Sequence, residues 1–325
     1  MTNSVPTLPE LLPEELITEI SAHSTRSVSP DFPILVEALL ERYGTAADGV
    51  ILYGSCLRTG DLDEGIVDLY VLVDNYKNAY AQRYLSLLNA WLAPNVFYLE
   101  VSHQGRPLRA KYAVISTADF EKGAQYWFHS YIWARFAQPS RLLFVRDEKN
   151  RRRIYNALAH SVITFLASGG KTLETDTYYT VEDIWTRCLM LSYAAELRPE
   201  QETRARHLAT LNLNDFTQLT KTAYPALTEI FNYQSDGNIY LCKNTTVTRQ
   251  RALKHWRLRR WQGRILSVLR LSKATLTFRD CLEYAAWKIE RHTGINIEIT
   301  PMLRRHPVIW GFKVMWQLLR RGIIR

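Results

Sequence analysis

The chain has 325 residues, 47% of them hydrophobic and 22% charged, and a formal net charge of +9. This composition is sufficient for a buried core and about two domains, and it excludes a largely disordered or collagen-like protein. The four cysteines are far apart and no uncharged apolar run reaches about 18 residues, so we expect no disulfide framework, no zinc site and no membrane-spanning helix.

The first part of the chain predicts a small mixed sheet preceded by helices. Helical spacing covers residues 8–45, and Gly44 is a residue type common at helix C-termini. Apolar or alternating segments predict strands at 49–55, 65–74, 95–103 and 109–117. A helix is predicted over 76–92, between the second and the third strand. We therefore expect an α+β protein whose first domain, over 1–117, is built around this sheet.

From residue 118 the hydrophobic pattern changes to a helical period. We expect a helical domain over 118–235, ending at the polar segment QSDGN, and then a basic helical region over 236–325, with helices near 249–270, 277–292 and 307–321. Residues 251–325 hold 17 basic and 4 acidic side chains, a net charge of +13, whereas residues 1–250 carry a net charge of −4. This asymmetry predicts a polyanionic partner, and a solvated basic helix surface is the alternative.

The segment VIWGFKVMWQLLRR (308–321) favours lipid over nucleic acid as that partner. In a helix its basic residues Lys313, Arg320 and Arg321 share one side, and most of the remaining surface is apolar. The apolar run is too short to span a bilayer, but basic residues beside Trp and Phe are typical of a helix lying in the membrane interface. We expect this helix to contact an anionic membrane surface, and packing on the protein's own core is the alternative.

The sequence Tyr53-Gly54-Ser55, followed on the next predicted strand by Asp68, carries the clearest chemical signal. Glycine lets backbone N–H groups approach a triphosphate, and the serine hydroxyl can bind a phosphate oxygen. A strand carboxylate can hold Mg²⁺ against the phosphates. This is the arrangement of nucleotidyltransferases, although a strand-end turn and a buried, hydrogen-bonded Asp68 would produce the same pattern.

A second carboxylate is missing from that motif. Many such enzymes have an acidic residue two positions after the first aspartate, and Tyr70 stands there in this chain. A two-metal site therefore needs an acid from elsewhere. The candidates are Glu100, on the third predicted strand, and Glu196, in the helical region.

Several blocks in the same order resemble the mitochondrial CDP-diacylglycerol synthases of the translocator-assembly-and-maintenance type, which are peripheral phosphatidate cytidylyltransferases. Residues 53–55 are similar to the family's YGSG, with Cys56 in place of its last glycine, and Asp68 matches its single motif aspartate. Three further blocks are similar to KYGVIS, AGRLQKP and LSYxGDxR of the family, namely KYAVIS (111–116), WARFAQP (133–139) and LSYAAELR (191–198).

The resemblance implies that CTP and phosphatidic acid react to give CDP-diacylglycerol and pyrophosphate, with Mg²⁺ as the cofactor. By position, Asp68 and Glu196 are the implied metal ligands, and both are implied in catalysis together with Lys111. The implied phosphate-binding residues are Gly54, Ser55, Lys111, Arg135 and Arg198. Arg204 is a weaker candidate. The lipid phosphate is already ionised near neutral pH, so no strong general base is required.

The resemblance also suggests the partners and the location. We expect CTP, phosphatidic acid and an anionic membrane as partners, and no nucleic acid. The N-terminal residues lack the Arg/Ser-rich, acid-poor pattern of a mitochondrial presequence. A bacterial relative, peripheral on the cytoplasmic side of the inner membrane, is therefore expected rather than a protein of the mitochondrial inner membrane.

Two other functions remain open on the sequence alone. One is a soluble nucleotidyltransferase with a different acceptor, such as a protein, an antibiotic or RNA. The other is a membrane-binding protein with this fold and no catalytic activity, which the missing second carboxylate permits.

Overall fold

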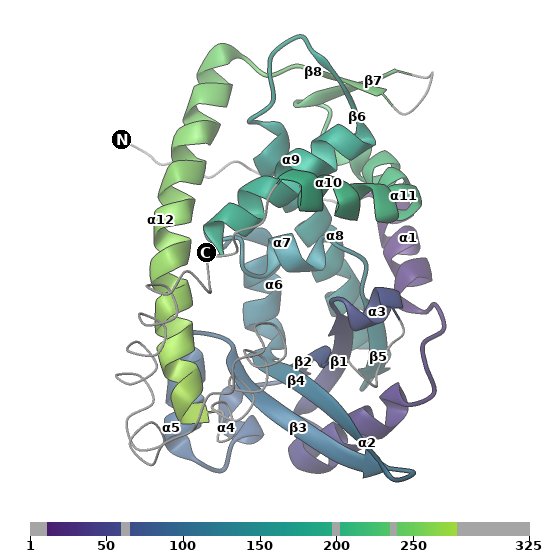
Figure 1. Ribbon diagram of the computed structural model, residues 1–325, viewed down its shortest axis with the longest axis vertical. Coiled ribbons are helices and arrows are strands. Elements are labelled where there is room, and N and C mark those ends of the chain that lie inside the picture. The colour runs from purple at the N-terminus through teal and green to yellow at the C-terminus, as the bar shows by residue number, and fades with distance from the viewer. Residues whose placement is uncertain (1–11, 60–65, 197–201, 235–238, 278–325) are drawn as a thin grey trace, which may run out of the picture.

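The computed structural model describes residues 12–59, 66–196, 202–234 and 239–277 (Figure 1). Its centre is a five-stranded mixed sheet in the order β3-β4-β2-β1-β5. The strands are β1 (Ala47–Tyr53), β2 (Val67–Val73), β3 (Asn95–His103), β4 (Arg106–Ser116) and β5 (Arg141–Val145). Strands β2 and β4 run parallel, and the other neighbours run antiparallel. The predicted α+β class is confirmed.

Each face of this sheet carries its own hydrophobic core, because successive strand side chains point to opposite sides. Ile51, Tyr70 and Ile115 pack into the larger core, which the sheet shares with the helical part of the chain. Leu52 and Leu69 pack into the smaller core on the other face. The central strands are apolar on both sides for this reason, which explains their nearly continuous hydrophobic sequences.

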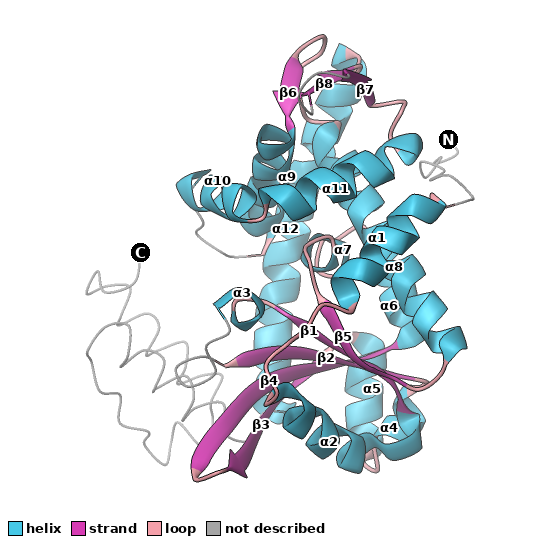
Figure 2. Ribbon diagram, turned by 90° about the vertical axis from the view of Figure 1, so that its right-hand side faces the viewer, coloured by secondary structure: helices cyan, strands magenta, loops and turns pink. Residues whose placement is uncertain are grey.

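Helices cover both faces of the sheet (Figure 2). The smaller core is closed by α2 (Phe32–Tyr43) and by the short segments around α4 (Tyr76–Ala79) and α5 (Arg83–Trp91). The predicted helix over 76–92 is thus two helices, separated where Tyr80 takes an extended conformation. The remaining elements before residue 117 are α1 (Glu14–Ser24), η1 (Gly44–Ala46) and α3 (Cys56–Thr59).

The helical part begins where predicted but contains strands that the sequence pattern did not indicate. Its helices are α6 (Thr117–Gln125), α7 (Trp133–Phe136), α8 (Glu148–Gly170), α9 (Val181–Ala195), α10 (Glu202–Leu211), α11 (Leu213–Ala223) and η2 (Tyr224–Ala226). Side chains cap several of them: Ser116, Asp147 and Thr180 each accept a hydrogen bond from the backbone of the first turn.

A second sheet of three strands, in the order β6-β8-β7, lies at one end of the helical part. It consists of β6 (Tyr178–Thr180), β7 (Phe231–Gln234) and β8 (Ile239–Cys242). The predicted boundary at 234–238 therefore falls between two strands that pair with each other. The predicted boundary at 117 likewise leaves β5 in the second domain, although β5 pairs with β1. The division into domains stays a prediction.

The helix predicted near 249–270 is α12 (Thr246–Thr277), which extends along the whole helical part and reaches the sheet end of the molecule (Figure 1). Trp256 fixes it by an edge-to-face contact with Trp133, at 5.8 Å between ring centroids. The helices predicted at 277–292 and 307–321 lie outside the described residues. Among the helices of the described ranges, none is long and apolar enough to cross a membrane.

Candidate active site

Four residues form a row across the strands on the face of the larger core. The register places Tyr53 opposite Asp68, Asp68 opposite Lys111, and Lys111 opposite Tyr98. Residues in register share a face of the sheet, so Asp68 and Lys111 point to the same side. The Lys111 Nζ lies 3.4 Å from the Asp68 Oδ1, and both side chains are partly exposed. The structure thus brings together the predicted metal ligand and the predicted phosphate-binding lysine.

Gly54 ends β1 beside this pair in a conformation that favours glycine. Its φ is +93°, in the left-handed region. A Cβ at this position would lie 2.8 Å from the Asp68 Oδ2, which is closer than ordinary contact. Glycine here keeps the space in front of the carboxylate open. Ser55 follows on the exposed surface at the turn into α3.

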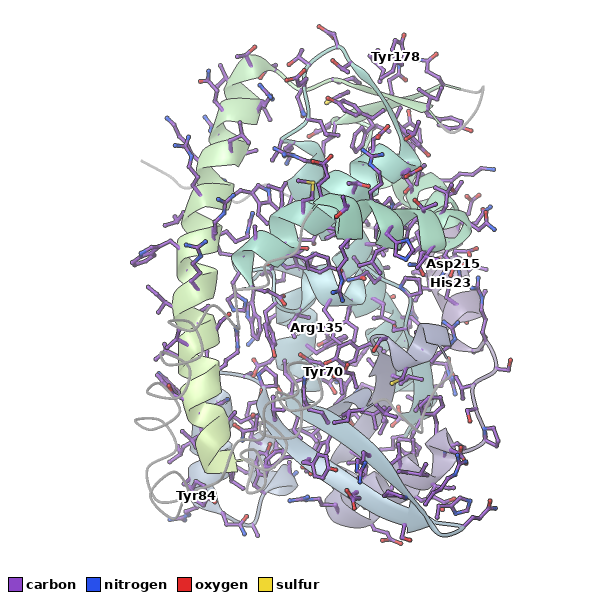
Figure 3. The ribbon with its side chains drawn as sticks, viewed as in Figure 1. His23, Tyr70, Tyr84, Arg135, Tyr178 and Asp215 are labelled. Atoms are coloured by element: carbon purple, nitrogen blue, oxygen red, sulfur yellow. The ribbon has the colours of Figure 1, made fainter. Side chains whose placement is uncertain are left out.

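Arg135 is the centre of a polar cluster next to the row. It comes from α7, and its Nη2 lies 3.1 Å from the Glu196 Oε2 in a mostly buried ion pair. Its Nη1 donates to the Tyr131 carbonyl at 2.9 Å and to the Tyr70 hydroxyl at 3.3 Å. Burial lowers the pKa of Arg135, but Glu196 and the tyrosines around the guanidinium, Tyr70, Tyr131 and Tyr53, together hold this pKa above its ordinary value. Figure 3 shows Arg135 above Tyr70, between the sheet and the helices.

Glu196 reaches the cluster because α9 ends at Ala195. Glu196 is the C-terminal cap of that helix, and its N–H donates to the Tyr193 carbonyl. Tyr70 stands where a second motif carboxylate is usual, and its hydroxyl accepts a hydrogen bond from Arg135. The acidic residue of this cluster is therefore Glu196, at the end of α9, and Arg135 links it to Tyr70.

Tyr131 is a site residue that the sequence did not single out. The guanidinium carbons of Arg135 and Arg270 lie 4.2 and 3.8 Å from the centroid of its ring. Burial raises the pKa of the Tyr131 hydroxyl, but the two arginines together lower it below its ordinary value. Tyr131 sits within an aromatic segment that reads as core, and Arg270 lies 135 positions further along the chain from Arg135, so only the tertiary structure reveals the cluster.

Glu100 lies on the same face of the sheet but at its outer edge, on β3. Its carboxylate accepts hydrogen bonds from Tyr98 at 2.7 Å and from Arg109 at 3.0 Å. The side chain is 46% exposed, and the hydrogen bonds from Tyr98 and Arg109 lower the pKa of its carboxyl group. Of the two candidate acids, Glu196 is the one paired with the predicted phosphate-binding arginine.

Two further arginines, Arg204 and Arg198, were candidates for phosphate binding. Arg204 is exposed on α10. Arg198 lies outside the described residues, and its role in phosphate binding stays a prediction.

The side chains at the row fit a magnesium ion that is held mainly by phosphates. Within the described parts of the chain, no three His, Cys, Asp or Glu side chains gather into a metal-binding group. Mg²⁺ is commonly bound through one or two carboxylates together with substrate phosphates and water. Asp68 supplies one such carboxylate, and Gly54 leaves its Oδ2 accessible. Glu196 as a second ligand stays a prediction, because its carboxylate is paired with Arg135.

Known proteins show little similarity to this chain. No family model matches the chain, and no curated protein matches it. Among solved structures, it is similar to the crystal structure of a nucleotidyltransferase-like protein from Exiguobacterium sibiricum 255-15, with 12% identity, 91% of each chain covered and a TM-score of 0.25. A TM-score this low does not establish a common fold, so the function has to be inferred from the site itself.

Proposed function

We propose that the protein is a Mg²⁺-dependent nucleotidyltransferase that transfers a cytidylyl group from CTP to phosphatidic acid, releasing pyrophosphate. The single observation that carries this proposal is that Gly54, just after β1, lies beside Asp68 of β2, which is in register with Lys111 of β4. A left-handed glycine, a strand carboxylate and a lysine 3.4 Å from it form a site suited to a metal-bound triphosphate.

Asp68, Gly54, Ser55 and Lys111 each have a defined part in this reaction. Asp68 holds the metal, which neutralises charge on the triphosphate when bound. Gly54 and Ser55 provide the turn against which the phosphates lie. Lys111, whose ammonium lies 3.4 Å from Asp68 on a partly exposed side chain, binds a phosphate oxygen and opposes the negative charge that develops on the leaving pyrophosphate.

The acceptor phosphate attacks the α-phosphorus, forming a new P–O bond as the bond to pyrophosphate breaks. Because a phosphomonoester is ionised near pH 7, the site has to orient it rather than remove a proton from it. Arg135 is suited to this task, since Glu196 and the Tyr131 carbonyl fix its guanidinium beside the row. A fixed guanidinium presents paired donors that match phosphate oxygens.

We propose an anionic membrane as the place of the reaction, and the outer face of α12 supports it. Leu258, Trp261 and Ile265 are 54%, 64% and 41% exposed and recur every three or four residues, so they share one side of the helix. The exposed residues Arg257, Arg260 and Arg264 flank that stripe. Apolar side chains bordered by cations suit the surface of an anionic membrane. The peripheral location on a bacterial inner membrane belongs to the same proposal.

Vesicle flotation tests the membrane part. The double variant Leu258→Ser/Trp261→Ser should float with phosphatidic-acid vesicles far less than the wild type. Leu211→Ser is the matched control, because Leu211 is 60% exposed on α10 and outside this surface. A chain ending at Thr300 tests the contribution of 308–321. If the double variant floats like the control, α12 is not a contact surface.

The reaction itself is tested with Asp68→Asn, which keeps the shape of the side chain and removes its charge. Pyrophosphate release should fall at least ~100-fold, the scale of losing one strong electrostatic contact in a transition state. Asp31→Asn is the matched control, because Asp31 forms a similarly exposed ion pair with Arg106 on the other side of the sheet. Unchanged release in Asp68→Asn would overturn the assignment of the metal ligand.

Calorimetry separates this proposal from a protein without activity. The wild type should bind CTP in the presence of Mg²⁺ and bind it much more weakly with EDTA. A chain that binds vesicles but no nucleotide would be a membrane-binding protein only. Turnover with a soluble acceptor in place of the lipid would favour the other alternative, a soluble nucleotidyltransferase.

A further inference from the structure

Helix α12 brings a third cation to the site, from a part of the chain that no motif marks. Its inner face packs closely on α9: a Cβ on Gly263 would lie 2.1 Å from the Ala195 carbonyl oxygen, so only glycine allows this approach. Ala195 is the residue before Glu196. Two turns further along the same inner face, Arg270 reaches the Tyr131 ring. The close helix contact therefore holds Arg270 near the Arg135–Glu196 pair.

Arg270 forms no direct ion pair with any of the described residues. Its Nε donates to the Ala93 carbonyl at 3.4 Å, while its Nη2 is enclosed and makes no hydrogen bond there. No carboxylate of the described chain forms an ion pair with it, in contrast to Arg135. Burial is the main cause that lowers the pKa of Arg270, with a smaller effect of Arg135, and Tyr131, Tyr70 and Glu196 only partly oppose it. A desolvated guanidinium with an unused donor is costly unless an anion binds to it.

The two guanidinium groups both lie close to the Tyr131 ring. Their central carbons lie 4.2 and 3.8 Å from the same ring centroid, so they cannot be more than 8.0 Å apart. A phosphate that accepts hydrogen bonds from a guanidinium places its phosphorus about 4 Å from the guanidinium carbon. A phosphate bound to Arg270 therefore also lies in the electrostatic field of Arg135.

We infer that Arg270 and Arg135 together form the subsite for the phosphomonoester of the acceptor, beside the Tyr131 ring. This inference rests on the proposed function for the identity of the acceptor. The triphosphate is assigned to Gly54, Asp68 and Lys111, which leaves the arginine pair for the second phosphate. The same helix presents its apolar and basic outer face to the membrane, so a lipid phosphate would enter next to α12.

Direct binding tests the subsite without depending on turnover. The probes are short-chain phosphatidic acid below its micelle concentration, glycerol 3-phosphate and Mg²⁺–CTP, each measured by calorimetry. In Arg270→Ala, affinity for both phosphomonoesters should fall about 10-fold or more, the scale of one charge-assisted hydrogen bond, while affinity for CTP stays within about 2-fold. Arg251→Ala is the matched control, because Arg251 is exposed on the same helix and is not part of the proposed membrane-contact surface.

Each other outcome decides against part of the account. Unchanged phosphomonoester binding in Arg270→Ala overturns the subsite. A loss confined to CTP assigns Arg270 to the nucleotide instead and overturns the acceptor assignment. If Arg270→Ala unfolds, Arg270→Lys keeps the charge without the planar fork and should bind the phosphomonoesters more weakly than the wild type. Should the wild type bind both phosphomonoesters through Arg270 yet release no pyrophosphate with phosphatidic acid, the subsite stands and the proposed reaction fails.

Discussion

Arg135 and Glu196 form an ion pair of 3.1 Å although 61 positions separate them, and their side chains are only 11% and 14% exposed. The pair links α7 to the end of α9. Because both charges are largely removed from water, each depends on the other, and the Arg135 guanidinium is held in one orientation. The same guanidinium donates hydrogen bonds to the Tyr70 hydroxyl and the Tyr131 carbonyl, so the ion pair fixes the position of the Arg135 charge in the site.

Glu196→Gln should reduce kcat/KM for pyrophosphate release at least ~10-fold, because it leaves Arg135 buried without its counter-charge. Glu100→Gln should change kcat/KM less than about 2-fold, since the ion pair of Glu100 with Arg109 is exposed and screened. Steady-state kinetics of both variants, with melting temperatures as a check on folding, test this order. A larger loss for Glu100→Gln would mean that the second acid comes from the sheet.

Gly54→Ala should abolish most nucleotide binding, because its Cβ would press on the Asp68 carboxylate and its φ is unfavourable for alanine. The strain alone costs about 1–2 kcal/mol of stability. Gly105→Ala offers a matched control: its φ is +78°, but a Cβ there meets nothing within 4 Å. Both variants should lose similar stability in chemical denaturation, and only Gly54→Ala should lose CTP affinity. Equal CTP affinity in the two variants would contradict the role of Gly54.

Lys273 should make stability depend on pH. This lysine of α12 is 4% exposed and donates to the Leu92 and Pro94 carbonyls. Burial, with a smaller effect of Arg270, lowers its pKa from 10.5 to about 7. Between these two values the unfolded chain binds a proton that the folded chain lacks, so stability rises with pH from about 7 to about 10, by at most about 1.4 kcal/mol per pH unit. Below pH 7 the full penalty of burying the charge is present.

The measurement is urea denaturation of the wild type and Lys273→Met at pH 6, 7, 8 and 9. The difference in unfolding free energy between the two should favour the methionine variant most at pH 6 and shrink as the pH increases. Comparing slopes rather than absolute stability removes the effect of the two lost hydrogen bonds. A difference that stays constant with pH would show that Lys273 keeps its ordinary pKa.

The strands β1, β2 and β4 could be predicted because buried central strands carry long apolar runs, and the edge strand β3 begins and ends at the predicted residues. Strand β5 was missed because its five residues lie between helical segments, and its pairing with β1 depends on contacts far along the chain. The strands β6 to β8 are three or four residues long, too short for a period to be recognised.

At the site, the sequence located the residues that lie on strands and in motifs. Asp68 and Lys111 were placed on separate predicted strands, and the parallel pairing of β2 with β4 sets them side by side. Tyr131 and Arg270 carry no local signal, because an aromatic residue among aromatics and an arginine in a basic helix are ordinary. Their meeting depends on the close packing of α12 on α9 at Gly263, which only the tertiary structure determines.

The most direct test of the account is pyrophosphate release measured with each of the four nucleoside triphosphates, with and without phosphatidic-acid vesicles, in the presence of Mg²⁺. We predict release with CTP only when the vesicles are present, and formation of CDP-diacylglycerol in the same samples. Release that does not depend on phosphatidic acid, or no release with any nucleotide under conditions where the chain is folded, would contradict it.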